Sequence, residues 1–153
     1  MLANFLALGD LVIERVKTEL PSDFQLVAHA ADLAGVKDSA QITPACHIVY
    51  LGARIGTQLQ AAAPPPAGKV AWDQDWMTVV VVRSAKDPKR LTGAMEVAGP
   101  LCGRLVKTLT GWKATDGVMP LEAEPPGVPP LPSSAGTLYV PLRWRARITQ
   151  FTT

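Results

Sequence analysis

Apolar residues near the start of the chain recur at helical spacing. Charged residues fall mainly on the opposite side, so residues 5–20 predict an amphipathic helix, which Pro21 ends. The apolar face of this helix is formed by Phe5, Leu8, Val12, Val16 and Leu20. Residues 24–30 (FQLVAHA) then predict a short strand, followed by an irregular connection with one helical turn at 30–34.

Two longer apolar runs predict a β-hairpin. Residues 47–55 (HIVYLGARI) are rich in β-branched and aromatic side chains. Residues 76–84 (WMTVVVVRS) are apolar almost throughout, which is typical of a strand covered on both faces. Between them, residues 61–69 (AAAPPPAGK) cannot pair in a central ladder, because proline has no amide hydrogen to donate. We therefore expect a hairpin of 47–55 with 70–84, and an exposed arm at its tip that contains Pro64, Pro65 and Pro66.

A second helix is predicted from Asp87 onward, with Asp87 as its N-cap and Pro88 at its first position. Apolar side chains continue at helical spacing, namely Leu91, Met95, Ala98, Leu101, Leu105 and Leu109. Pro100 should kink or restart this helix, and Gly111 is well placed to end it. The proline-rich residues 119–134 then predict a mobile loop, or an arm that a neighbouring subunit orders. The expected contact residues of this arm are Pro125, Pro126, Pro129 and Pro130.

The last strand, residues 138–149 (LYVPLRWRARIT), alternates between two kinds of side chain. Its even-numbered positions from Val140 to Ile148 are apolar and should face the core, whereas Arg143, Arg145 and Arg147 form a row on the other face. Pro141 indicates that the start of this strand lies near a sheet edge. The order of elements predicts a single α+β domain over residues 1–153, with two helices packed on one face of a mainly antiparallel β-sheet.

The arginine row allows two interpretations that the residues alone leave open. Arg143, Arg145 and Arg147 could line a solvent-facing strand, where their charge prevents edge-to-edge aggregation. They could equally form a polar interface or face a polyanion. A second cationic group, Lys86, Lys89 and Arg90, precedes the second helix, either as a solvated loop or as a contact with a subunit or a phosphate.

Composition narrows the class of protein. Charged residues make up 18% of the chain and the formal net charge is +2, so the isolated chain is not expected to bind DNA irrespective of sequence. The two cysteines, Cys46 and Cys102, lie in apolar stretches and predict buried, reduced thiols. The first twenty residues lack the basic start of a signal peptide, and no apolar run is long enough for a membrane span. We expect intracellular synthesis and no membrane partner.

No catalytic constellation can be assembled from the sequence. His29 and His47 lie in separate predicted strands and are expected to be structural. Asp73 and Asp75 face the same way on a strand, so a divalent cation site is conceivable, but a solvated strand entry is the favoured interpretation. Glycine-rich phosphate loops and the common hydrolase motifs are missing. We therefore expect no cofactor, no metal site and no enzymatic activity.

Four segments, taken in order, resemble a known family. They are TPACHIVYLG (43–52), QDWMTVVVVRS (74–84), AGPLCGRLVKTLTGW (98–112) and LYVPLRW (138–144). They look like segments of the tail-terminator proteins of long-tailed bacteriophages, the Mu-like group in particular. The resemblance covers the chain from about Ala30 onward, and it is carried by the ordered set rather than by any single motif.

The resemblance implies a virion structural protein that acts in tail assembly. Six copies would form a ring at the head-proximal end of the tail tube, stop further tube subunits from adding, and dock the head–tail connector protein. In contractile tails the ring would also meet the sheath protein, and genomic DNA would pass through its lumen without sequence-specific binding. The arginine row and the cationic group would then lie at subunit contacts or along the DNA channel.

Three alternatives remain beside this interpretation. A head-completion or connector protein that docks from the capsid side has a similar composition. A nucleic-acid or small-molecule binding module would need a basic groove or a concave pocket with converging polar groups. An enzyme would need residues that this chain lacks. The two-helix, sheet-rich pattern favours the tail side.

Overall fold

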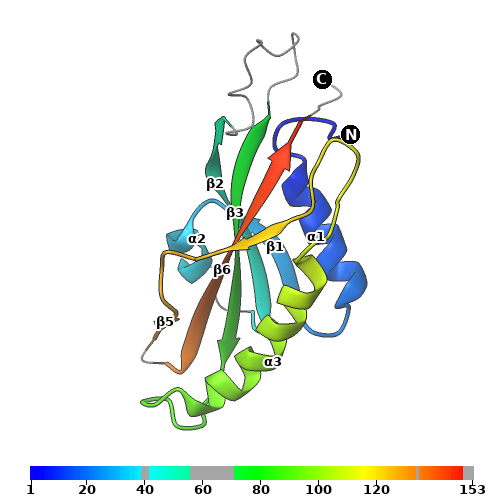
Figure 1. Ribbon diagram of the computed structural model, residues 1–153. Helices are drawn as coiled ribbons and strands as arrows, with labels where there is room; N and C mark the ends of the chain where they lie inside the picture. Colours follow the sequence, from blue (N-terminus) through cyan, green and yellow to red (C-terminus); the bar gives the residue numbers. More distant parts are fainter. Residues whose placement is uncertain (39–41, 56–70, 134, 150–153) are drawn as a thin grey trace.

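The computed structural model describes residues 1–38, 42–55, 71–133 and 135–149, and its strands form one sheet (Figure 1). The strands are β1 (Leu26–Ala30), β2 (Ala45–Ile55), β3 (Trp72–Arg83), β4 (Glu122–Glu124), β5 (Leu131–Pro132) and β6 (Thr137–Ile148). They lie in the order β1-β2-β3-β6-β4, and β5 also pairs with β6. Only the pairing of β1 with β2 is parallel among these strands. The predicted α+β class and the mainly antiparallel sheet are confirmed.

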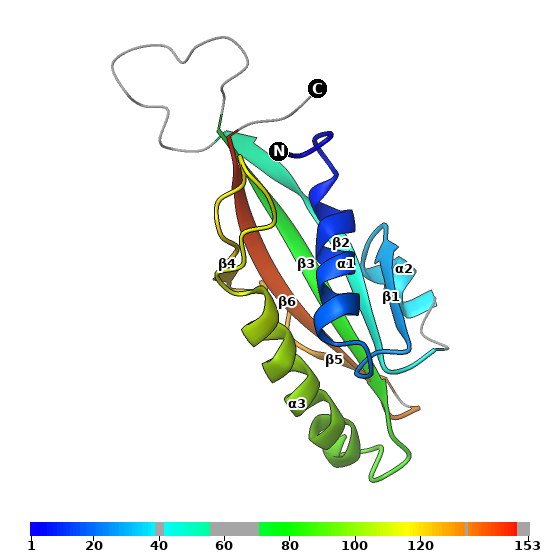
Figure 2. The ribbon, with the colours of Figure 1, turned by 90° about the vertical axis from the view of Figure 1, so that its right-hand side faces the viewer.

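Within the described residues, three helices cover this sheet, namely α1 (Leu8–Glu19), α2 (Leu33–Asp38) and α3 (Thr92–Leu109). Helices α1 and α3 lie on one face, as predicted, and we call this the inner face (Figure 2). Helix α2 packs on the opposite, outer face over a second apolar cluster that includes Val36, Val49 and Val79. The predicted single helical turn near residue 30 is therefore a helix of six residues that begins later.

The central hairpin explains why both faces of the sheet need cover. Strands β2 and β3 pair from Ala45 opposite Val81 to Ile55 opposite Trp72, which confirms the predicted hairpin. Along β3, Val80 and Val82 belong to the inner cluster and Val79 and Val81 to the outer one. Alternation along a strand thus places this apolar run in two cores, as its unbroken pattern predicted. The proline arm at 61–69, with Pro64, Pro65 and Pro66, lies outside the described residues.

Helix α1 packs closely on the sheet through Gly9. A side-chain carbon built at Gly9 would lie 2.6 Å from the His29 ring and 2.7 Å from the Trp76 ring. Only glycine allows the backbone of α1 to lie this close to the two rings of the sheet, although glycine in general weakens a helix. The predicted apolar face of α1 is confirmed, because Leu8, Val12 and Val16 are buried.

The start of α3 differs from the prediction. Asp87 adopts a left-handed conformation (φ 48°) in a turn, and its backbone oxygen accepts hydrogen bonds from the amides of Arg90 and Leu91. The helix begins five residues later, at Thr92, without a side-chain N-cap. Asp87 as N-cap and Pro88 at the first helical position were therefore wrong, because the turn satisfies its own backbone groups before the helix starts.

Helix α3 also continues where a restart was expected. It runs from Thr92 to Leu109 with Pro100 inside it. Pro100 is exposed, so its ring is accommodated on the solvent side of the helix. Five of the six predicted apolar positions pack in or against the core, whereas Met95 is 60% exposed.

The second proline-rich stretch is part of the sheet and not a free arm. Strand β4 pairs with residues 143–145 of β6, and β5 pairs with residues 138–139 of the same strand. Residues 119–133 are thus held by their own chain, because backbone pairing with β6 supplies the order that we had assigned to a neighbour. Pro141 lies in the gap between the two short strands, which confirms its predicted place near an edge.

Candidate functional site

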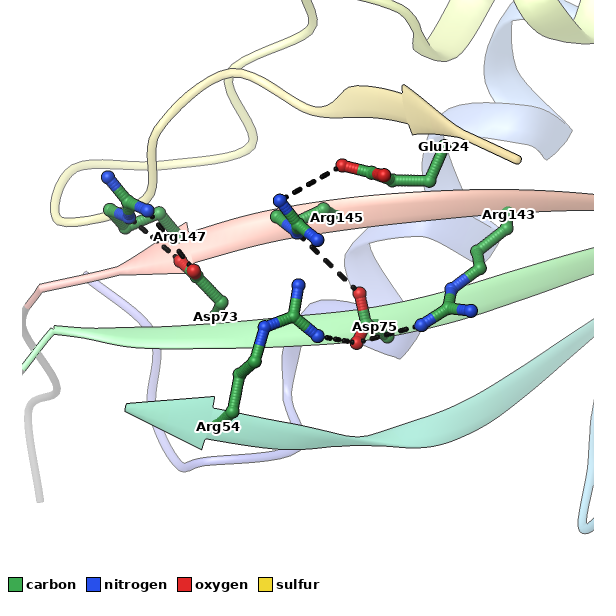
Figure 3. A network of polar contacts seen from close by, with 7 residues as sticks. All are labelled: Arg54, Asp73, Asp75, Glu124, Arg143, Arg145 and Arg147. Atoms are coloured by element: carbon green, nitrogen blue, oxygen red, sulfur yellow. Dashed lines mark hydrogen bonds and ion pairs between the residues drawn. The ribbon is translucent and has the colours of Figure 1, made fainter. Parts of the chain in front are cut away.

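The arginine row lies on the outer face of the sheet, where β3 begins and β6 ends. The antiparallel register sets Asp73 opposite Arg147 and Asp75 opposite Arg145. Both aspartates alternate with inward-facing residues of β3, just as the arginines alternate with inward-facing residues of β6. Two acidic and three basic side chains therefore share one face (Figure 3).

Asp73 and Arg147 form a two-point pair across β3 and β6. The Arg147 Nε donates to Asp73 Oδ1 at 2.7 Å, and the second guanidinium nitrogen donates to Oδ2 at 3.1 Å. Asp73 is only 3% exposed. The hydrogen bond from Arg147 lowers the pKa of Asp73 against the opposing effect of burial, and the same bond raises the pKa of Arg147. Two parallel hydrogen bonds between charged groups make this a strong and directional contact.

Asp75 gathers the other three guanidinium groups. Its Oδ2 accepts a hydrogen bond from Arg54 of β2 at 2.6 Å and lies 3.1 Å from a nitrogen of Arg143. Its Oδ1 lies 3.8 Å from the Nε of Arg145, which also reaches Glu124 of β4 at 3.1 Å. The cluster joins β2, β3, β6 and β4, so it ties four strands together through side chains (Figure 3).

This geometry corrects the interpretation of the acidic pair. Asp73 and Asp75 are buried, so they are not a solvated strand entry. They are held by arginines, and within the described residues there is no cluster of three or more potential metal ligands. Arg54 and Glu124 were missed. The shared alternation of 73, 75 and 143, 145, 147 was a usable signal for the central pairs, whereas Arg54 and Glu124 depend on strand order.

The paired charges change what this face can do. Arg54, Arg143, Arg145 and Arg147 are matched by Asp73, Asp75 and Glu124, which leaves a small cationic excess. Three of the arginines remain 24–32% exposed. Such a surface can exchange hydrogen bonds with another protein, but it offers a phosphate backbone little free positive charge.

Two hollows border the cluster. One, of about 150 Å³, lies beside Asp73, Arg145 and Arg147. The other, of about 520 Å³, runs between the start of α2 and residues 126–128, with Met77 and Arg143 among its lining residues. Pro126 thus lines a groove of its own chain, and Pro130 lines another on the inner face. Pro125 and Pro129 are exposed on the same stretch between β4 and β5.

The second cationic group is not brought to the arginine row. Residues 86–90 follow the far end of β3, where Arg83 pairs with Thr137, whereas the arginine row lies toward Trp72. Lys86 binds Glu96 of α3 at 2.9 Å, and both side chains are exposed. Lys89 and Arg90 are exposed, with no carboxylate partner in the described part of the chain. The two groups therefore belong to separate surfaces.

The remaining candidate residues have structural environments. His29 is hydrogen-bonded to Asp10 at 2.8 Å, and burial lowers the pKa of His47. Cys46 is buried and Cys102 half-buried, both are free thiols, and burial raises the pKa of each. None of the helices that the structure describes is long and apolar enough to cross a membrane.

Fold and site together define a small α+β protein in which acidic and basic side chains pair with one another across the sheet. The family model described as phage tail terminator protein matches residues 1–151. The chain therefore belongs to the phage tail terminator family, and it is a structural protein of the virion. The match names no subgroup, so membership of the Mu-like group stays a prediction.

Similarity to individual proteins is remote. A chain in a solved structure titled "Virion of native gene transfer agent (GTA) particle" superimposes with a TM-score of 0.48 at 15% sequence identity. The aligned region covers 93% of this chain and 94% of that one. No curated protein matches the sequence.

Proposed function

We propose that the chain is the tail terminator of its virion. Copies of it form a ring, most simply of six, that caps the head-proximal end of the tail tube and stops tube subunits from adding. The ring then docks the head–tail connector protein, and in a contractile tail it also contacts the sheath protein. Genomic DNA passes through the lumen without sequence-specific binding. The observation that carries this proposal is the family match over residues 1–151.

The geometry of the arginine cluster favours a subunit contact over a DNA channel. Arg143 and Arg54 both bind Asp75, so one of them can turn to a carboxylate on a neighbour while the buried aspartate keeps the other. A lumen for DNA needs no such pairing, and the matched carboxylates weaken its attraction for phosphates. We therefore assign the cluster to the interface between neighbouring subunits, where its planar donors suit polar contacts.

The experiment is electron microscopy of particles from an infection that lacks this gene. We expect tail tubes of uneven and excessive length beside heads without tails, because nothing would stop tube growth. Tails of normal length beside filled, detached heads would instead support a head-completion protein on the capsid side. Normal virions would refute both functions.

Complementation of the same infection tests the interface. The wild-type gene should restore virions, whereas a gene encoding Arg143→Gln should not, although Arg54 still holds Asp75 in that variant. Purified Arg143→Gln is the control for folding. It should fold like the wild type, so that a failure to rescue reflects a lost contact and not a lost structure. Full rescue by the variant would remove Arg143 from the interface.

A further inference from the structure

Helix α3 carries a second apolar stripe that the sheet does not cover. This stripe consists of Leu91, Met95, Gly99, Cys102 and Val106, which are spaced four, four, three and four residues apart. Such spacing places them along one side of the helix. The side that packs on the sheet is formed by other residues, namely Ala94, Ala98, Leu101, Leu105 and Leu109. Leu91 and Cys102 are partly buried against the inner cluster, but Met95 is 60% and Val106 is 38% exposed, so much of the second stripe is uncovered within the described chain.

A groove runs along this stripe. It has a volume of about 410 Å³, with Leu138 and Val140 of β6 at its base and Pro130 and Pro132 on the side opposite α3. Its lining contains no charged residue, and the Cys102 thiol is the most polar side chain in it. Helix α1 covers β1 and β2 on the other side of α3 (Figure 2). The groove therefore lies where a third helix would complete the layer on the inner face.

Gly99 has no side chain, so the surface of α3 is bare at this point of the stripe. A side-chain carbon built at Gly99 would meet no atom within 4 Å beyond its two chain neighbours. One of these neighbours is Pro100, whose ring disfavours the helical conformation of a preceding residue that carries a side chain, so glycine also eases the helix through Pro100. A bare helix surface does allow the backbone of another segment to approach closely.

The charges around α3 indicate the kind of segment that fits. Lys89 and Arg90 precede the helix and Lys107 lies in its last turn, and all three are exposed without a carboxylate partner in the described residues. Of the carboxylates nearby, Glu96 binds Lys86 and Asp23 binds Arg104, whereas Asp87 accepts a hydrogen bond from the Thr92 hydroxyl. Lys89 and Arg90 outnumber Asp87, so the apolar groove is bordered by a net positive charge at both ends of the helix.

We propose that this groove binds an amphipathic helix with acidic flanks from a partner protein, laid along α3. The residues of α3 and its start that line the groove run from Leu91 to Cys102, or about 16 Å at 1.5 Å per residue, which suits about three turns of a helix. A small ligand fits less well, because the lining lacks the converging polar groups that orient one. The proposal rests on the surface of this chain and does not depend on ring formation.

Synthetic helical peptides bearing a leucine or alanine stripe flanked by glutamates are the probe. Fluorescence anisotropy would measure their binding to the full chain, and peptides with lysine in place of glutamate would serve as the charge control. Gly99→Leu fills the groove, and Gly103→Leu is the matched variant, because Gly103 is also free of contacts but does not line the groove. Leucine favours helix over glycine at 103, whereas at 99 it precedes Pro100, so the helix content of both variants is compared with the wild type by circular dichroism before binding is measured.

We expect the glutamate peptides with leucine stripes to bind the wild type and Gly103→Leu equally. Gly99→Leu and the lysine peptides should weaken binding at least about tenfold. Binding that ignores peptide charge or survives Gly99→Leu would overturn the proposal, as would no binding of any glutamate peptide. Self-association of the chain that Gly99→Leu abolishes would also overturn it, because the groove would then belong to a contact between copies. None of these outcomes bears on tube length in the infection experiment.

Discussion

Asp73 is a buried carboxylate whose position depends on one arginine. Removing that arginine would leave a negative charge on the sheet with little solvent to stabilise it, which costs more than the pair itself contributes. The partner of Asp73 keeps 24% of its surface exposed, so water moderates this cost. The pair is thus better described as a requirement for local structure than as a large source of stability.

A double-mutant cycle tests this description. Arg147→Met alone should lower the free energy of unfolding by about 2–4 kcal/mol, because Asp73 loses both hydrogen bonds. Asp73→Leu with Arg147→Met should recover most of that loss, since no unpaired charge remains. Chemical denaturation at neutral pH measures both. Equal stability of the single and the double variant would show that Asp73 finds another partner.

The lowered pKa of Asp73 predicts how stability responds to acid. The folded state prefers the charged carboxylate, so its contribution is complete above the ordinary value near 3.8. That contribution is lost as the pH falls through the lower pKa of the folded state. The stability difference between the wild type and Asp73→Asn should therefore be constant from about pH 5 to 7 and shrink below about pH 4. Denaturation curves at several pH values measure it, and a difference that stays constant into strong acid would contradict the assignment.

Helix α3 shows how a sheet overrides local preference. Pro100 removes one backbone donor, and Gly99 and Gly103 add flexibility, yet the helix is continuous from Thr92 to Leu109. Ala98, Leu101 and Leu105 are buried against the inner face, and this burial holds the helix together across its weak centre. The helix therefore does not restart at Pro100, and the reason is its tertiary packing.

Replacing this proline should stabilise the protein. Pro100→Ala restores an amide that can donate to the carbonyl of Glu96, and the site is exposed, so nothing else needs to move. We expect a gain of about 1–3 kcal/mol in the free energy of unfolding. Gly103→Ala is the comparison variant, because its new side chain meets no neighbouring atom. It should raise the free energy of unfolding by less than about 1 kcal/mol. Both gains appear in thermal or urea unfolding, and a loss in Pro100→Ala would mean that the helix needs its proline.

Helices and strands with a regular spacing of apolar residues could be predicted from the sequence. Elements whose position depends on contacts with distant parts of the chain could not. The alternation along residues 138–149 correctly gave one apolar and one arginine face, because a strand has only two sides. Helix α2 was underestimated, since its Val36 is buried by the outer cluster and six residues show no period. The start of α3 was misplaced because turn geometry at Asp87, not capping preference, decides it.

At the scale of the whole molecule, the order of strands could not be deduced from sequence. That order brings Arg54 from β2 and Glu124 from β4 to a common cluster, so two of its seven residues could not be predicted from the sequence. The same topology uses the residues after 119, which composition alone marks as unable to fold, to flank β6. Composition indicates only whether a segment can fold on its own. The proline-rich stretch after residue 119 is ordered because β6 supplies its backbone hydrogen-bond partners.

The two short strands on β6 have a further consequence. A polymer that grows by adding strands needs every subunit to offer a free edge on both sides of its sheet. Here the β6 side ends in strands of three and two residues, separated by a gap that contains Pro141, which has no amide to donate. The described part of β1 pairs with β2 alone and offers an uninterrupted edge of five residues. The two edges of the sheet are therefore unequal, and strand addition is favoured at β1 over the short, interrupted edge beside β6.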